Sequence, residues 1–435
     1  MSKLKQFRDP DLSLWQSAVD EVVAQKTGGT RSQDVGGGTT VARPDTSQSM
    51  VRAAAVDLTA DESNQPLQPP AEITPAVAEG ALDVAKYCSN VARKLAWAII
   101  KCDAVQEAIC REQLGKYTVC DPGWAEVVEK YVEFQAEKGT VPYRVYTDID
   151  QYVIDGKIPD NKARIAIVGD WGTGQDPAKK VLAQIVRKQP DVVIHLGDIY
   201  YSCTDFEMQQ YFYNIWSSML DLSKTPTFTL SGNHDMFAGG AAYYNLIDKL
   251  QQPASYFCLR NKSWQFVALD TGLHDRKPGG TDPTYLETTE VDWFKRRIDQ
   301  AQGRRTILLT HHQLFTAFED IVPGKAVNDT LNAQLGPLLP QLSIWIWGHE
   351  HNLVIYKKQI GILARCVGHG AFPVGLGEVP DQPSHPEIPI ENFRLDAGDA
   401  FYTHGYALID LDGTSAKISY YQDSDEDNPV FVDNL

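Results

Sequence analysis

The stretch IAIVGDWGTGQDPAKK, residues Ile165–Lys180, decides the fold. An apolar run ends on Asp170, and a glycine-rich turn then leads into a predicted helix. Strand, turn and helix in this order are typical of α/β folds, whose ligands bind at the carboxyl ends of parallel strands. Asp170 is therefore placed to bind a ligand. The residues after it, Trp171 and Gly172, are not ordinary metal ligands, so its partners must come from elsewhere in the chain.

Further apolar runs that end on a polar residue follow along the chain. They are DVVIHLGD (191–198), TFTLSGNHD (227–235), QFVALDTG (265–272), RTILLTHH (305–312) and SIWIWGHEH (343–351). Predicted helices lie between them, at residues 178–188, 206–220 and 288–301. Alternating strands and helices predict an α/β fold with largely parallel central pairing.

Shorter strands are expected on either side of this series. They are YRVYTDI (143–149), YVIDG (152–156), ILARCVGHG (362–370) and YALIDLDG (406–413). The chain then ends in QDSDEDNPVFVDNL (422–435), an acidic stretch that we expect to be a solvated tail.

The N-terminal part of the chain has a different composition. It begins with an amphipathic helical pattern, continues through a stretch rich in Gly, Thr, Ser, Pro and Gln that predicts a flexible linker, and returns to helical periodicity. We expect one long helix over 75–113 and a second over 121–137. The predicted organisation is a short helix (1–26), a linker (27–75), a helical extension (76–140) and a catalytic domain (141–435) with its motif core at 162–413.

Charge and hydropathy exclude several classes of protein. The formal charge is 40 − 57 = −17, and without a basic stripe such a chain repels nucleic acid. No apolar run is long enough to span a bilayer. The N-terminus carries charges from its start and lacks a Sec-type signal, which predicts a soluble cytoplasmic protein, with export by another route left open. Most of the seven cysteines are expected to be buried thiols of a reducing compartment.

The polar residues that follow the strands form one set. They are Asp170, Asp198, Asn233 with His234, His311, and His349 with His351. Two carboxylates, an amide oxygen and several imidazoles are more ligands than one divalent ion needs, and they fit two metals that share a carboxylate. Taken singly, a lone Asp after a strand is a turn cap and His195 is a core histidine. The glycine-rich stretch also lacks the order of a nucleotide-binding loop.

The ordered motifs GDWG, GDIYY, GNHD, LLTH and GHEH resemble those of the calcineurin-like metallophosphoesterases. They are most similar to the purple acid phosphatase branch. The resemblance implies a four-layer α/β/β/α sandwich. In the fourth motif Leu308 stands where the branch has valine, and two histidines follow it. Either could be the ligand; we assign His311, which matches the spacing.

The same resemblance implies the ligands of each metal. In most members of the superfamily the first motif is D-x-H, but here Gly172 replaces the histidine. Tyr201, three residues after Asp198, matches the coordinating tyrosine of purple acid phosphatases, whose phenolate favours Fe(III). Alternatively, Tyr201 is a packed aromatic residue. Metal one would take Asp170, Asp198, Tyr201 and His351. Metal two, a divalent Fe, Zn or Mn ion, would take Asp198, Asn233, His311 and His349.

The implied activity is hydrolysis of phosphate esters by attack of a metal-bound hydroxide on phosphorus. His234 would donate a proton to the leaving group and Asp235 would orient it. His312, His369 and His274 are candidates for substrate contact or support. The implied substrate is a small phosphomonoester; the alternatives are a phosphodiester, cyclic nucleotides included, and a non-catalytic partner-binding protein on the same fold. The N-terminal helical region is a candidate for binding a protein partner of unknown identity.

Overall fold

The computed structural model describes residues 9–27, 78–116, 123–137, 141–274, 283–376, 383–391, 395–398 and 401–435. The chain divides into two compact units, residues 1–139 and 140–435. The predicted linker lies outside the described residues from position 28 on. Within the described parts, no helix is both long and apolar enough to span a bilayer.

The N-terminal unit is helical, as predicted. Its helices are α2 (Pro10–Thr27), α4 (Ala78–Ile100), α5 (Ala104–Lys116) and α6 (Gly123–Glu137). Trp15 of α2 packs edge-on against Tyr131 of α6, with ring centroids 5.3 Å apart. The prediction of a single helix over 75–113 is wrong, because α4 ends at Ile100 and a new helix begins at Ala104. The Asp103 carboxylate caps this new helix by accepting from the Gln106 N–H at 3.0 Å.

The cysteines follow the expectation only in part. Cys110, Cys203, Cys258 and Cys366 are buried free thiols. Cys102 is free but exposed, and Cys88 is disulfide-bonded. The expectation that most of the cysteines are buried thiols is confirmed by these four, and Cys88 and Cys102 are exceptions to it.

The second unit contains two β-sheets. The seven-stranded sheet has the order β1 (Val153–Asp155), β5 (Phe257–Arg260), β6 (Trp264–Ala268), β7 (Arg305–Leu309), β8 (Leu342–Trp347), β10 (Ala364–Val367), β9 (Leu353–Ile355). The six-stranded sheet has the order β13 (Phe431–Asn434), β12 (Ser415–Gln422), β11 (Gly405–Asp412), β2 (Lys162–Val168), β3 (Val192–His195), β4 (Thr227–Thr229). The pairs within β2–β3–β4 and β6–β7–β8 are parallel, as predicted. The strand expected over 143–149 is not formed.

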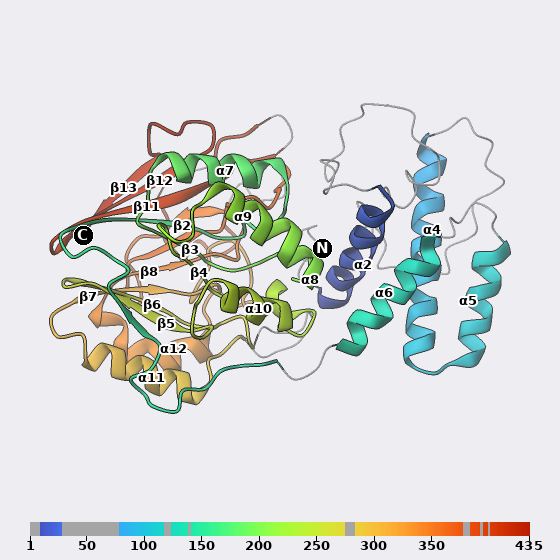
Figure 1. The fold of residues 1–435 in the computed structure, drawn as a ribbon, viewed down its shortest axis with the longest axis horizontal. Helices are drawn as coiled ribbons and strands as arrows, with labels where there is room; N and C mark the ends of the chain where they lie inside the picture. The colour runs from blue at the N-terminus through green and yellow to red at the C-terminus, as the bar shows by residue number, and fades with distance from the viewer. Residues whose placement is uncertain are drawn as a thin grey trace. The chain divides into compact units, whose positions relative to one another are not determined.

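Helices cover the outer face of each sheet. α7 (Asp176–Arg187), α9 (Asn214–Met219) and α10 (Ala241–Lys249) lie on the six-stranded sheet, and α11 (Thr288–Asp299) and α12 (Asp329–Leu335) on the other (Figure 1). The short α8 (Asp205–Glu207) comes between β3 and α9 in the chain. Ile165 and Ile167 of β2 pack into the core between the sheets, while Ala166 and Val168 pack against the helices. This alternation, with both faces buried, explains the continuous apolar runs. The four-layer α/β/β/α sandwich is confirmed.

The C-terminal stretch is not a solvated tail throughout. β13 pairs antiparallel with β12, and the Asp433 side chain is only 10% exposed. Its carboxylate accepts from Arg365 of β10 through two nitrogens, at 2.8 and 2.7 Å, and from the Tyr420 hydroxyl at 2.8 Å. The expectation of a solvated tail is therefore wrong for this strand, because a buried cation in the opposite sheet binds its carboxylate.

Replacing Asp433 by alanine is expected to lower the free energy of unfolding by about 3–5 kcal/mol, because it leaves a buried guanidinium without its partner. Urea denaturation of the full chain measures this change. Asp427→Ala, at an exposed position of the same stretch, is the control and should change stability by less than about 0.5 kcal/mol. Equal midpoints for the two variants would contradict the prediction.

Candidate dinuclear metal site

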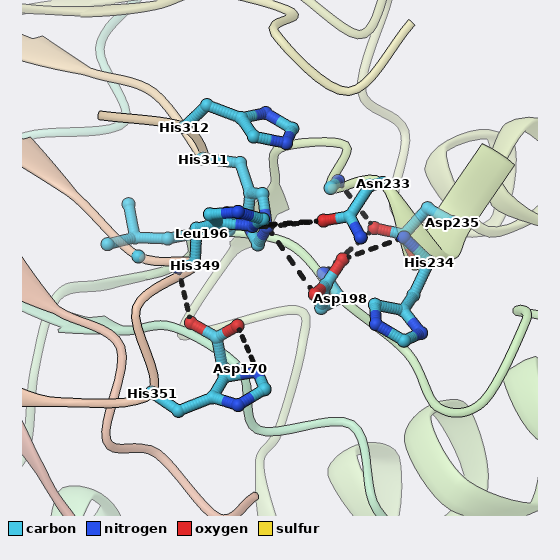
Figure 2. Close-up of polar contacts among 12 residues, drawn as sticks. Asp170, Leu196, Asp198, Asn233, His234, Asp235, His311, His312, His349 and His351 are labelled. Atoms are coloured by element: carbon cyan, nitrogen blue, oxygen red, sulfur yellow. Dashed lines mark hydrogen bonds and ion pairs between the residues drawn. The ribbon is translucent and has the colours of Figure 1, made fainter. Parts of the chain in front are cut away.

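The predicted ligand residues converge at one edge of the two sheets. Asp170 follows β2, Asp198 follows β3, Asn233 follows β4, His311 follows β7, and His349 with His351 follows β8. Their side chains point toward one another (Figure 2). Asp170, Asn233 and His311 are fully buried. The structure thus brings residues from five separate strand ends into one buried cluster.

One group of donor atoms surrounds Asn233. Its Oδ1 lies 3.2 Å from His311 Nε2 and 3.1 Å from His349 Nδ1, and Asp198 Oδ2 lies 3.4 Å from His311 Nε2. The other nitrogen of His311, Nδ1, lies 2.9 Å from the Leu196 carbonyl, to which it donates. In the neutral tautomer Nε2 then presents a lone pair to the Asn233 and Asp198 oxygens. Lone pairs that face one another in this way suit a shared cation.

A second group surrounds Asp170. His351 Nε2 lies 3.4 Å from Asp170 Oδ1. The hydroxyl of Tyr200 lies 2.9 Å from Asp170 Oδ1, 3.1 Å from Asp198 Oδ2 and 2.9 Å from His351 Nε2. Asp198 therefore contributes to both groups, and a tyrosine hydroxyl completes the one around Asp170.

The tyrosine at this position is one residue earlier than predicted. The hydrogen bonds described for Tyr201 are made by its main chain: its N–H donates to the Glu207 carboxylate, and its carbonyl accepts from His234 Nδ1 at 2.6 Å. The hydroxyl that lies beside Asp170, Asp198 and His351 is that of Tyr200, whereas the resemblance implied Tyr201 for this place. The reason is the path of the turn after β3, which carries the ring of Tyr200 into the cluster.

Close packing explains why position 172 is glycine. A Cβ at Gly172 would lie 2.7 Å from the Ile199 Cα and 2.8 Å from the Asp198 carbonyl oxygen. Residues 172 and 199 also form a parallel β-bridge. A histidine at this position, as in the D-x-H motif, would collide with the main chain that carries Asp198 and Tyr200.

Replacing Gly172 by alanine is expected to destabilise the protein by about 1–3 kcal/mol, because the added methyl group overpacks the turn after β3. Thermal unfolding measures the effect. Adding Ile199→Ala should not restore stability, since the nearest atoms belong to the main chain. An alanine variant as stable as the unmodified protein would contradict this packing argument.

Four of the cluster residues have left-handed backbone conformations. The φ angles are 57° at Asp170, 75° at Asp198, 68° at His349 and 51° at His351. Non-glycine residues seldom adopt such angles, and they persist mainly where the surrounding structure enforces them. Each turn thereby aims its side chain back toward the centre of the cluster.

His234 and Asp235 follow Asn233 but have separate roles. His234 is fully buried, and its Nε2 has no hydrogen-bond partner among the described residues. Asp235 does not orient it. The Asp235 carboxylate instead accepts from the N–H groups of Asp198 at 2.9 Å, Ile199 at 3.1 Å and Gly232 at 2.7 Å. Asp235 thus joins the turn after β3 to the turn after β4.

The other candidate histidines are distributed unevenly. His312 lies beside the cluster: its ring centroid is 4.4 Å from that of His349, and its Nδ1 is 3.1 Å from Thr271 Oγ1. The contacts described with Asn233 and Asp198 are made by His311. His369 Nε2 faces the Tyr421 carbonyl at 3.2 Å. His274 pairs with Glu287 at 2.6 Å and stacks on Tyr285.

His195 also lies outside the set of ligands. It is fully buried, and its Nδ1 lies 2.9 Å from Thr229 Oγ1. Burial lowers its pKa to about 3, so that it stays neutral. His195 is therefore a core histidine, as predicted.

Residues 163–353 match the family model described as calcineurin-like phosphoesterase. This part of the chain is similar to calcineurin-like phosphoesterases. The 3',5'-cyclic adenosine monophosphate phosphodiesterase CpdA of Pseudomonas aeruginosa is 27% identical over 185 residues, which are 41% of this chain and 62% of that protein. The match spans less than two thirds of the length of this relative.

Solved structures with a similar arrangement include purple acid phosphatase PPD1 from Lupinus luteus, with a TM-score of 0.46 and 15% identity over 63% of this chain and 54% of that one. GAP50, the anchor in the inner membrane complex of Plasmodium, has the same TM-score and identity and covers 63% of this chain and 89% of its own. A dimetal phosphatase from Danio rerio has a TM-score of 0.43 and 12% identity, over 63% of this chain and 99% of that one.

The donor set of this cluster fits metal ions. Asp170, Asp198 and His311 offer ligand atoms within 4.8 Å of one another, and so do His311, His312 and His349. Burial raises the pKa of the Tyr200 phenol well above its usual value, and Asp170 and Asp198 raise it further. Burial lowers the pKa of His311, but Asp198 and its other neighbours outweigh this and raise it to about 9. The carboxylates of Asp170 and Asp198 contribute to both shifts, and their negative charge suits bound cations.

Sequence reasoning missed two buried glutamates next to the candidate metal site. The Glu207 carboxylate accepts from the N–H groups of Tyr201, Ser202 and Thr204, and so shapes the turn that carries Tyr200. Glu350 lies inside the GHEH motif, between two candidate ligands. Charged residues are seldom fully buried unless they are paired. The apolar residues on both sides of GHEH were the one signal that could have drawn attention to Glu350.

Proposed function

We propose that this metal-dependent phosphoesterase hydrolyses small phosphodiesters, with Tyr200 rather than Tyr201 among the ligands of metal one. The observation that carries the proposal is the pair of donor groups that share Asp198. Asp170, Asp198, Tyr200 and His351 hold one metal, and Asp198, Asn233, His311 and His349 hold the other. Every ligand position has a donor, which argues against a non-catalytic protein on this fold.

The metals supply phosphate binding and a water of lowered pKa. The chain supplies their placement and a proton. His234 Nδ1 is held by the Tyr201 carbonyl at 2.6 Å, which turns Nε2 away from the main chain. His234 Nε2 has no hydrogen-bond partner among the described residues. Because Nδ1 donates to the Tyr201 carbonyl, Nε2 carries a proton only when the ring is an imidazolium, and in that form it would donate this proton to the leaving oxygen of the ester. The Asp235 carboxylate accepts from main-chain N–H groups of both turns and so fixes the position of Asp198 relative to Asn233.

The diester preference has two supports. CpdA of Pseudomonas aeruginosa is a cyclic-nucleotide phosphodiesterase with sequence similarity to this chain. The side-chain partners described for Asp170, Asp198 and Asn233 are histidine and tyrosine. A site whose positive charge comes from its metals suits a singly charged diester better than a doubly charged monoester.

Phosphomonoester hydrolysis is the second candidate. The glycine at position 172 and the tyrosine hydroxyl beside Asp170 favour it, because both features resemble purple acid phosphatases. With the same resemblance, metal one would be Fe(III) and metal two a divalent Fe, Zn or Mn ion. Metal analysis together with a visible spectrum identifies the ions.

The deciding experiment compares three substrates on one preparation of known metal content: a bis-aryl phosphodiester, 3',5'-cyclic AMP and an aryl phosphomonoester. We expect a higher kcat/KM for one of the diesters than for the monoester. A preference for the monoester would replace the proposal by its alternative. A preparation that holds two metal equivalents and hydrolyses none of the three would refute hydrolysis of small phosphate esters.

A further inference from the structure

Glu350 separates the two histidines of the GHEH motif, and its side chain lies among buried aromatic residues. The residue is 6% exposed. His349 and His351 turn toward the donor groups on either side of Asp170. The Glu350 side chain instead contacts residues on the side of the motif that faces away from these donor groups. The motif is therefore fixed by the histidines on one side and by Glu350 on the other.

The Glu350 carboxylate accepts several hydrogen bonds. Oε1 accepts from the Thr316 hydroxyl at 2.6 Å and from the Tyr356 hydroxyl at 3.0 Å. Oε2 accepts from the Trp347 indole N–H at 2.9 Å and from the same tyrosine at 3.1 Å. A buried carboxylate is tolerated when donors saturate it in this way. These bonds also fix both of its oxygens in space.

The three donors come from the segments that carry metal ligands. Trp347 is the last residue of β8, just before the motif. Thr316 lies four positions beyond His312, and Tyr356 directly follows β9. The Gly348 N–H also donates to the His311 carbonyl at 3.0 Å. The segments around His311 and around His349–His351 therefore meet at one carboxylate.

We propose that Glu350 is a positioning residue of the dinuclear centre: by joining Thr316, Trp347 and Tyr356, its carboxylate fixes the turn on which His349 and His351 point to the two metals. The left-handed φ angles at both histidines make such support necessary. Groups that hold metal ligands in place commonly matter to metal affinity by a large factor. The inference rests on the proposed metal site.

Titration of the metal-free full-length protein with Co²⁺, followed by its visible bands, tests this role without reference to activity. Glu350→Ala is expected to weaken Co²⁺ binding by about 10- to 100-fold and to alter the band shape. Glu350→Gln should stay near the unmodified protein. Its oxygen can accept from Trp347, and its amide can donate to the hydroxyls of Thr316 and Tyr356.

Thr316→Val and Tyr356→Phe each remove one donor, and we expect weaker binding than in the unmodified protein but stronger binding than in Glu350→Ala. They keep the test decisive if the alanine variant does not fold. Unchanged Co²⁺ affinity and bands in the folded variants, with only a lower Tm, would overturn the inference in favour of a purely structural residue. Equal losses of Co²⁺ affinity in Glu350→Gln and Glu350→Ala would also overturn it, because they would show that the negative charge of Glu350 matters and its hydrogen bonds do not.

The outcomes also separate this inference from the proposed function. If the unmodified protein binds two equivalents of Co²⁺ and hydrolyses no phosphate ester, the proposed function fails while the titration still decides the role of Glu350. If the diester is hydrolysed and the folded Glu350 variants bind Co²⁺ normally, the role of Glu350 fails alone.

Discussion

Replacing Asp198 by asparagine is expected to abolish turnover and to remove at least one metal equivalent. Asp198 Oδ2 faces both donor groups, 3.4 Å from His311 Nε2 and 3.1 Å from the Tyr200 hydroxyl. The loss of activity in this variant should be larger than the roughly 10- to 100-fold loss that follows when a group that only supports a metal ligand is removed. Asparagine tolerates the φ angle of 75° at this position, so the fold should survive.

Metal analysis and steady-state kinetics on the same preparation measure this result. Asp191→Asn is the matched control, because Asp191 immediately precedes β3 whereas Asp198 follows it. Its carboxylate accepts from the Arg164 N–H at 2.7 Å, a bond that an asparagine oxygen can keep. The control should retain turnover and both metals. An Asp198 variant that still turns over substrate would show that this residue does not join the two metals.

Replacing Tyr200 by phenylalanine is expected to remove a phenolate-to-Fe(III) charge-transfer band from the iron-loaded protein and to lower kcat/KM by at least about 100-fold, the upper end of the cost for supporting groups. Phenylalanine keeps the ring contacts with His234 and Phe372, whose centroids lie 4.6 and 4.7 Å away. The variant therefore removes one hydroxyl and little of the packing.

Tyr201→Phe is the matched comparison for this prediction, since the motif spacing implies Tyr201 as the ligand whereas the hydroxyl that lies beside Asp170 and Asp198 is that of Tyr200. The visible spectrum of both variants after loading with iron gives the answer. A band that survives in Tyr200→Phe and disappears in Tyr201→Phe would return the ligand to the residue that the motif spacing predicts. A colourless, iron-free and active protein would leave two divalent ions.

The strands that carry the site could be predicted because both of their faces are buried, and such strands appear in the sequence as continuous apolar runs. β2, β3, β7 and β8 were all expected from such runs, and the order of the polar residues after them indicated which side chains would meet. The short strands were harder. β1 was recognised, but residues 143–149 have the composition of a strand without forming one.

The spacing of the motif could not predict which hydroxyl, that of Tyr200 or that of Tyr201, lies in the candidate metal site. Adjacent residues of a turn point in different directions, and the direction depends on the backbone angles. At Asp198 the φ angle is left-handed, and Glu207 fixes the following turn through main-chain N–H groups. Neither feature has a sequence signature that was recognised.

Long-range partners account for the remaining errors. Asp433 was read as solvated because its neighbours in sequence are acidic, yet Arg365, 68 residues earlier, binds it. Asp235 was assigned to His234 because the two are adjacent, yet its carboxylate reaches the main chain at Asp198, 37 residues earlier. Adjacency in sequence says little about the partner of a buried carboxylate.

The left-handed turns at Asp170, Asp198, His349 and His351 set a limit on engineering this protein for heat resistance. Residues in such conformations each cost roughly 1–3 kcal/mol, and glycine adopts them freely. A screen that selects only for folded, heat-resistant variants would thus favour glycine at the very positions that are proposed to hold the metals. Screens for robust variants should therefore be run with metal and substrate present, so that stability is not gained by dismantling the centre.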